Sequence, residues 1–274
     1  MEKSAFINIG DLTYNNTPFH IAVLNGNAFI VGLFLQHNAN VNARTNDDLT
    51  PLLIAAEGGH SDIVDLLLQN GALADIRNAE GSTALHIAAW NGHTSVVENL
   101  IQRGIDLHTQ NIYQETALHL AAQQGHQQVV DILLVAGANV HYVDEEGSTA
   151  LHLSARNGHV AISEALIMKG ANVNCKNSRN ITPLHVAAME TCNEKTIQLL
   201  LKYGADVNEK GDFDDTALHN ASFFGNSSVV EALLKGNADG DAHVYGMTAL
   251  HIAARYGHTS VVNTLIHWQF DIQT

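Results

Sequence analysis

Apolar and polar positions follow a pattern that recurs about every 33 residues along this chain. A representative copy opens with "TALHIAAWNGH" at residues 83–93, where apolar and small residues precede a glycine turn. The run "SVVENLI" at residues 95–101 then places its apolar side chains at i, i+1, i+4 and i+5, on one face of a helix. Gly104 and a polar, turn-rich segment follow. The pattern predicts two short helices per copy, joined by a tight turn and followed by a polar connection.

The threonine that opens each copy occurs eight times, in successive steps of 33, 33, 33, 33, 33, 34 and 32 residues. The copies, numbered here as repeats one to eight in chain order, open at Thr17, Thr50, Thr83, Thr116, Thr149, Thr182, Thr216 and Thr248. Self-similarity at a fixed period indicates a tandem array, in which each copy buries its apolar faces against its neighbours. We therefore expect a single repeat domain over residues 1–274.

The residue types at the helix ends have physical reasons. Threonine is a favoured N-cap because its hydroxyl accepts a hydrogen bond from the first helical turn, and proline suits the next position. Thr50-Pro51 is one such helix start. Glycine, as at Gly92, accepts the left-handed backbone that ends a helix.

The opening motifs "TPFHIA", "TPLLIA", "TALHIA" and "TPLHVA", each followed by a turn, an apolar run and in most copies "G-A-x-V", resemble the ankyrin repeat. The resemblance implies an all-α helical repeat: a solenoid of paired antiparallel helices with projecting, hairpin-like fingers. Eight stacked repeats would form a curved rod on the order of 80 Å long, with a long concave groove.

Two steps in the array are irregular. In the sixth repeat "AAMETCNEKTIQLLLKYG" puts Gly204 one residue late, which predicts an insertion between the two helices. In the seventh, "SVVEALLKGN" reaches Gly236 one residue early, which predicts a shortened second helix.

Charge and composition narrow the partner classes. The formal net charge is −15, so the average field repels phosphate backbones and anionic membranes, and neither nucleic acid nor membrane is an expected partner. No segment is long and apolar enough to span a bilayer, and the opening "MEKSAFINIGDL" does not have the continuous apolar core that a signal peptide needs. Two cysteines in no CxxC spacing fit a reducing compartment. We expect a cytoplasmic location, with the nucleus, or a host cytosol for a bacterial protein, as alternatives.

Seventeen histidines raise the question of metal binding or catalysis. Seven belong to the opening motif, and the ankyrin resemblance implies that these are buried and bonded to the threonine and to the adjacent repeat: His20, His86, His119, His152, His185, His219 and His251. Five more follow the turn glycine: His60, His93, His126, His159 and His258. The two sets lie at opposite ends of a helix of roughly 10 Å rise, too far apart to share a metal. His185 and Cys192 are separated in the same way, so no catalytic pair, metal or cofactor is expected, and the chain is not expected to be an enzyme.

Asparagines at the start of three fingers suggest a modification. Asn42, Asn174 and Asn208 occupy the position at which ankyrin repeats of animal cells can be hydroxylated. The competing interpretation is that each asparagine serves the turn.

Recognition is expected at positions that the repeat leaves free. The resemblance implies that partners bind the finger tips and the exposed side of the first helix. Large or charged side chains of the kind that anchor interfaces occupy these positions at Trp90, Tyr113, Arg156, Met189, Phe213, Phe223, Phe224, Tyr245, Arg255 and Tyr256. We predict a non-enzymatic module or scaffold, a monomer, that binds a protein partner in its groove. The alternative is a substrate-recruiting N-terminal region of a larger multidomain enzyme or a host-directed effector.

Acidic residues in the fingers bear on the charge of the partner. They are Asp47, Asp48, Glu145, Glu146, Asp212, Asp214 and Asp215. They would suit a partner with basic residues and speed its encounter. A solvated acidic surface is the competing explanation.

The two ends of the array differ. Residues 8–16, "NIGDLTYNN", predict an abbreviated polar finger before the first repeat. The last repeat keeps the internal apolar pattern, and "HWQFDIQT" stands where another finger would begin. Either Trp268 and Phe270 fold over that end, or the chain is the front part of a longer protein, which is the interpretation we favour.

Overall fold

The computed structural model describes residues 6–190 and 193–272, with the side chains of residues 7–190 and 193–268. The chain divides into two compact units, Met1–Asn139 and Val140–Thr274. The first unit contains the 3-10 helix η1 (Phe6–Asn8) and the helices α1 (Pro18–Leu24), α2 (Ala28–Gln36), α3 (Pro51–Glu57), α4 (Ser61–Gln69), α5 (Ala84–Asn91), α6 (Thr94–Gln102), α7 (Ala117–Gln124) and α8 (Gln127–Val135). The second contains α9 (Ala150–Arg156), α10 (Val160–Met168), α11 (Pro183–Met189), α12 (Glu194–Lys202), α13 (Ala217–Phe224), α14 (Ser227–Lys235), α15 (Ala249–Arg255) and α16 (Thr259–Ile272).

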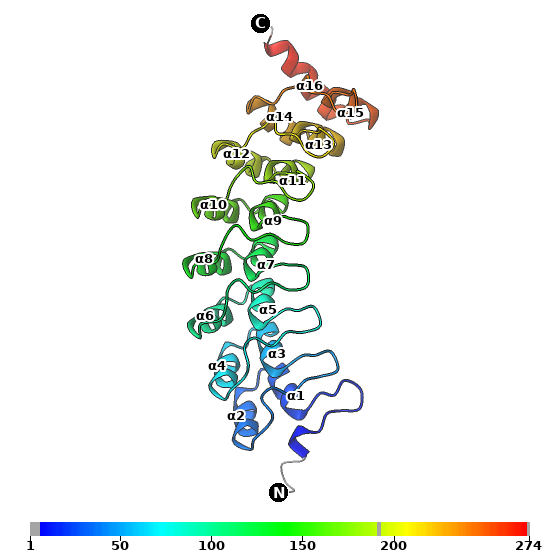
Figure 1. Cartoon of the computed structure of the whole chain (residues 1–274). Helices are drawn as coiled ribbons and strands as arrows, with labels where there is room; N and C mark the ends of the chain where they lie inside the picture. The colour runs from blue at the N-terminus through cyan, green and yellow to red at the C-terminus, as the bar shows by residue number, and fades with distance from the viewer. Residues whose placement is uncertain (1–5, 191–192, 273–274) are drawn as a thin grey trace. The chain divides into compact units, whose positions relative to one another are not determined.

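Each unit is a two-layer stack of helix pairs. In the first, α1, α3, α5 and α7 pack in one layer and α2, α4, α6 and α8 in the other, and each first helix also contacts the second helix of its own repeat (Figure 1). In the second unit α9, α11, α13 and α15 form the first-helix layer and α10, α12, α14 and α16 the other. In both units the fingers project beside the first helices (Figure 1). The predicted all-α helical repeat is confirmed, and no helix in the described part of the chain could cross a membrane.

A reciprocal capping box begins the first helix in seven of the eight repeats. In the third repeat the N–H of Thr83 donates to Nδ1 of His86 at 3.2 Å, and the threonine hydroxyl lies 2.9 Å from the same nitrogen. Thr50 caps α3 without a histidine: its hydroxyl accepts from the N–H of Leu53. The predicted threonine caps are therefore present, and histidine takes the place that Glu or Gln has in the usual capping box.

A left-handed glycine ends the first helix in several repeats, and the next repeat packs directly on it. Gly92 has φ 73° at the C-cap of α5. A Cβ atom there would lie 2.5 Å from Nδ1 of His126. Nε2 of His126 donates to the carbonyl oxygen of Trp90 at 2.8 Å. The glycine thus serves both the backbone conformation and the close approach of the next repeat.

Each finger is a tight hairpin-like turn. In the finger that precedes Thr116, the N–H of Asn111 donates to the carbonyl of Glu115 at 3.0 Å, and the Asn111 side chain accepts from the N–H groups of Tyr113 and Glu115. A backbone bond of 3.0 Å from Ile112 N to Glu80 O joins this finger to its neighbour. The expectation of projecting, hairpin-like fingers is confirmed.

The extra residue of the sixth repeat lies between its helices, as the sequence predicts. Three residues separate α9 from α10, whereas residues 190–193 separate α11 from α12. Glu190, which follows α11, has an extended backbone in place of a left-handed turn.

The shortened second helix predicted for the seventh repeat is wrong. Helix α14 has 9 residues, as α6 has. Gly236 is the C-cap at φ −85°, and Asn237 takes the left-handed position at φ 66°. The deletion falls in the following finger, where Val244 and Met247 pair across the two-residue turn Tyr245-Gly246. Asparagine tolerates the left-handed region well enough to replace glycine, so the helix keeps its length.

Both ends of the array have regular backbone. The N–H of Asp11 donates to the carbonyl of Asn16, and Asn46 N donates to Tyr14 O at 2.8 Å, so residues 11–16 form the abbreviated finger predicted. At the other end α16 continues to Ile272 where the sequence pattern would start a finger. Trp268 is half-buried, and the side chain of Phe270 lies outside the described residues.

We expect Gly92→Ala to destabilise the chain more than Gly104→Ala. Both glycines have φ near 74°, so each alanine pays about 1 kcal/mol of backbone strain, but only at Gly92 does a neighbour occupy the Cβ site. Displacing His126 also breaks its bond to Trp90, which adds about 1 kcal/mol. Urea unfolding of the two variants measures the difference, and equal losses would contradict the proposed close contact.

Candidate protein-binding surface

The ten predicted contact residues fall at three positions of the repeat. Three are at the finger tip, three residues before the opening threonine, five are seven residues after that threonine, and two are eight residues after it. The finger-tip residues are Tyr113, Phe213 and Tyr245, and the helix-end residues are Trp90, Arg156, Met189, Phe223, Arg255, Phe224 and Tyr256. We call these finger-tip and helix-end positions together the variable face of a repeat.

Most of these side chains are accessible. The seven aromatic residues among them are between 43% and 76% exposed. Arg156 and Arg255 are exposed, and Met189 is half-buried. Large aromatic side chains at this exposure contribute little to the repeat core, which leaves their apolar area available to a partner.

In the first unit the two aromatic residues sit on backbone that neighbouring groups hold in place. Trp90 lies in the last turn of α5, and its carbonyl accepts from His126 of the next repeat. The N–H of Tyr113 donates to Oδ1 of Asn111 at 3.0 Å within its own finger. The side chains therefore project from fixed turns.

In the second unit three aromatic rings meet at the ends of α13 and α15. Phe223 packs edge-to-face on Phe224 at 5.0 Å and on Tyr256 at 4.6 Å between ring centroids. His258 stacks on Tyr256 at 6.4 Å and donates from Nε2 to the carbonyl of Phe223 at 2.9 Å. We call Phe223, Phe224 and Tyr256 the aromatic cluster. The sequence shows that these residues occupy neighbouring positions in adjacent repeats, but it does not show that their rings touch.

A second ring contact joins two finger tips of this unit. Phe213 and Tyr245 lie 6.2 Å apart, and they are 65% and 76% exposed. Asp212 and Asp214, both exposed, stand on either side of Phe213 in the chain. The tips thus combine apolar rings with carboxylates.

The two predicted contact arginines have partners within their own unit. Nε of Arg156 lies 3.5 Å from a carboxylate oxygen of Glu190. Nη1 of Arg255 lies 3.9 Å from the sulfur of Met247. Both pairs are exposed and contribute little stability, so these side chains can exchange partners at small cost.

Several acidic finger residues are also paired at the surface. Asp48 lies 3.1 Å from Arg44, Glu146 2.9 Å from Arg179 and Asp214 3.8 Å from Lys210. Asp212 accepts from Nδ2 of Asn180 at 2.7 Å. The fingers are acidic, and nearby Arg, Lys or Asn side chains pair with some of their carboxylates.

Five of the motif histidines bond the first helix to the finger that follows it: His20, His86, His152, His185 and His219. Nδ1 of His86 accepts from the N–H of Thr83, so the proton is on Nε2, which lies 3.1 Å from the carbonyl of Glu115 and donates to it. Six of the seven motif histidines are buried, at 2% exposure or less, as predicted. His251 is the exception: it is exposed in the last repeat, where no further repeat covers it in this structure.

Burial controls the protonation of these imidazoles. Desolvation lowers the pKa of His86 to about 4 and that of His152 to about 4, from 6.5. It also lowers the pKa of His20, His185 and His219. They are neutral structural groups at neutral pH.

The second set of histidines also has a structural role. His60, His93, His126 and His258 donate from Nε2 to carbonyls at the first-helix ends of the preceding repeats. Asn193 and Asn226 do the same from Nδ2 in two of the three repeats that lack this histidine.

The described residues contain no group of three or more His, Cys, Asp or Glu side chains placed to hold a metal. His185 is engaged with Thr182 and with the carbonyl of Asp215, and Cys192 lies outside the described residues. Cys175 lies 3.6 Å from the hydroxyl of Thr149, and burial raises the pKa of its thiol, so thiolate chemistry is disfavoured there.

The candidate asparagines link neighbouring repeats. Nδ2 of Asn174 donates to Gly204 O at 3.0 Å, and its Oδ1 accepts from Asp206 N at 2.8 Å. Asn42 and Asn208 make the same reciprocal pair with the following repeat. Each asparagine therefore also bonds the next repeat, beyond its own turn; hydroxylation stays a prediction.

The structure exposes three further large apolar residues near the first repeat, two of them at variable-face positions. Tyr14 is a finger-tip residue at 57% exposure, and Leu24 is a helix-end residue at 59%. Phe29 of α2 is 76% exposed where other second helices carry Asp62 or Ser95. Aligning the first repeat with the other seven identifies all three as large apolar residues at positions that the repeat core does not use.

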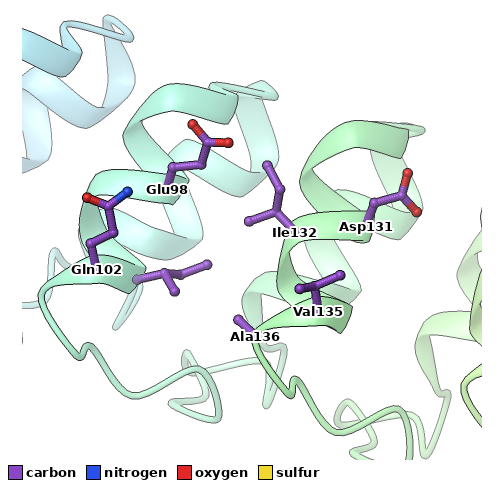
Figure 2. Close-up of a pocket in the computed structure, with 7 residues that line it drawn as sticks. Glu98, Gln102, Asp131, Ile132, Val135 and Ala136 are labelled. Atoms are coloured by element: carbon purple, nitrogen blue, oxygen red, sulfur yellow. The ribbon is translucent and has the colours of Figure 1, made fainter.

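A shallow apolar pocket lies on the second-helix layer of the first unit. Glu98 and Gln102 of α6 and Ile132 and Val135 of α8 face it (Figure 2). The sequence pattern of a single repeat does not predict this pocket, because the pocket forms between the second helices of two adjacent repeats.

Comparison with known proteins agrees with this architecture. A family model described as "Ankyrin repeats (3 copies)" matches residues 3–78, 19–111, 73–144, 118–211 and 184–274. No curated protein matches the chain.

We expect the chain to lose stability as pH falls from about 6.5 towards 4. In that window the unfolded imidazoles bind protons that the buried ones do not, so each such group contributes up to about 1.4 kcal/mol per pH unit. Urea unfolding at a series of pH values measures this slope.

A His86→Leu variant, which copies Leu53 of the second repeat, should have a flatter slope. Leu85→Ala is the matched control, because it empties core volume beside His86 and should lower stability equally at every pH. The same midpoint at pH 7 and pH 4.5 in the unsubstituted chain would contradict the assignment.

Proposed function

Since the chain belongs to the ankyrin-repeat family, whose repeats generally serve as protein-protein interaction modules, we propose that it is a non-enzymatic scaffold that binds a protein partner through its variable face. The observation that carries this proposal is the exposure of seven aromatic side chains at the finger-tip and helix-end positions. Aromatic residues and arginine dominate the energetic centres of protein interfaces.

The framework bonds support the same assignment. Carbonyls at helix-end positions, those of Trp90 and Phe223 among them, accept from a histidine of the next repeat. A side chain on a fixed backbone loses less conformational entropy when it is bound, which favours affinity. The repeat thus presents variable side chains on an invariant support.

We also propose that the eight repeats work as one domain in the cytoplasm. A family match over residues 118–211 runs across the boundary between the two units and supports a continuous array. The half-buried free thiol of Cys175 supports a reducing compartment.

We expect a triple variant, Trp90→Ala, Phe223→Ala and Phe224→Ala, to lose more than about ten-fold in captured partner in a pull-down with the purified chain. The three side chains are 44%, 43% and 48% exposed, so their truncation should leave the fold intact, which a thermal melt checks. Val135→Ala is the control, since Val135 is 80% exposed on the second-helix layer, away from the variable face. Undiminished capture by the triple variant would refute the surface assignment.

A further inference from the structure

A polar pair links second helices of adjacent repeats in both units. The carboxylate of Asp65 on α4 accepts from Nη2 of Arg103, the residue directly after α6. In the second unit the carboxylate of Glu164 on α10 accepts at 2.9 Å from the hydroxyl of Tyr203, the residue directly after α12. In each pair, a long side chain at the end of one second helix reaches back to an acidic residue of the preceding second helix.

Glu98 of α6 occupies the acidic position of this pair, but the long side chain is missing. Glu98 follows Asp65 by 33 residues, and the residue that follows Arg103 by 33 is Ala136, directly after α8. A methyl group cannot reach across to the preceding helix. Within the described part of the chain, no ion pair or side-chain hydrogen bond engages the Glu98 carboxylate, which is exposed.

The shallow apolar pocket between α6 and α8 lies beside this unpaired carboxylate. Ile101 of α6 and Ile132 and Ala136 of α8 line it together with Glu98, and the side chain of Ile132 projects from α8 toward α6 (Figure 2). Both isoleucines are half-buried, so part of their apolar surface is open to solvent. A longer side chain at position 136 would cover this surface. The pocket therefore suits a group with an apolar stem and a cationic end.

Charge and geometry favour arginine as that group. Asp131 adds a second carboxylate to the lining, and its hydrogen bond from Nε2 of Gln127, at 2.8 Å, leaves its charge uncompensated. The formal charge of the whole chain is −15, which attracts cations at long range. A guanidinium is more weakly hydrated than an ammonium and can bind a carboxylate through two parallel hydrogen bonds. Arg103 makes the equivalent contact with Asp65 one repeat earlier.

We propose that a partner protein inserts an arginine side chain into this pocket, with its methylene groups on Ile101 and Ile132 and its guanidinium on the Glu98 carboxylate. The partner thereby supplies the side chain that the fourth repeat lacks. This site lies on the second-helix layer and goes beyond the proposed function, because it gives the chain a contact surface separate from the variable face. A protein held by the variable face does not need it, so Val135→Ala remains a valid control in the pull-down described above.

The test selects random peptides of about twelve residues, displayed on phage, against the full chain. An excess of the soluble Ala136→Arg variant is present as competitor. Its own arginine fills the pocket, so the competitor removes peptides that bind anywhere else on the chain. We expect the recovered peptides to share an arginine, and synthetic copies to bind in solution with affinity that falls as salt rises. Citrulline in place of that arginine should weaken binding by about ten-fold, because it keeps the shape and loses the charge.

Glu98→Gln separates binding from folding. It should weaken the selected peptides by about ten-fold and leave the urea midpoint unchanged, because the carboxylate makes no bond within the fold. Asp65→Asn is the matched control: it makes the equivalent change one repeat earlier, where Arg103 already occupies the carboxylate. Peptide affinity should therefore stay within about two-fold in that variant.

Ala136→Arg provides a check on the pocket itself. Its arginine should pair with Glu98 as Arg103 pairs with Asp65, so the urea midpoint should not fall, while the peptides should lose about ten-fold or more in affinity. An unchanged midpoint also shows that the competitor is folded.

Three results would overturn the inference: no peptide that survives the competition, recovered peptides without arginine, or unchanged affinity in Glu98→Gln. Peptides weakened by the triple variant Trp90→Ala, Phe223→Ala and Phe224→Ala, and not by Glu98→Gln, would also overturn it, because they bind the variable face. The proposed function would stand in each of these cases, since the pull-down tests it separately.

Discussion

Within each unit the fold depends on hydrogen bonds that join neighbouring repeats. A short first helix has too few residues to be stable alone, and its buried histidine would leave polar atoms unpaired. In the stack the same imidazole accepts from its own threonine and donates to the following finger, as His86 does to Glu115. Burial then keeps the ring neutral, which this pattern of one acceptor and one donor requires. Each repeat is therefore stable only when it is stacked on its neighbours.

This constraint explains why so few positions are free to vary. Threonine, histidine, the small residues and the turn glycine each contact the neighbouring repeat or cap a helix. A side chain at Gly92 would have to displace His126, which lies against it. What remains are the finger tips and the last residues of each first helix, where Trp90 and Phe223 sit. Variation in those residues changes the surface without changing the stack.

The framework is predictable from the sequence because its signal repeats in every copy. The period, the threonine caps, the glycine turns and the insertion between α11 and α12 all follow from spacing. Features of a single copy are not predictable in this way. The early Gly236 predicts a shorter helix, but Asn237 supplies the left-handed residue, and the deletion lies in the finger. The repeat pattern also predicts that His251 is buried like the other motif histidines, whereas it is exposed. Ring contacts within the aromatic cluster depend on side-chain rotamers, which repeat spacing does not encode.

Departures from the motif separate residues that serve the fold from those that do not. Leu53 replaces a motif histidine with a buried apolar side chain, so no polar atom is left unpaired on its side chain. Asn193 and Asn226 replace the second histidine but keep a donor to carbonyls of the preceding repeat. None of these substitutions leaves a buried polar atom of the new side chain without a hydrogen-bond partner. Asn220 does: its amide nitrogen is buried and unpaired beside exposed aromatic rings. This departure costs the fold a buried, unpaired donor that the aliphatic residues of the other repeats avoid.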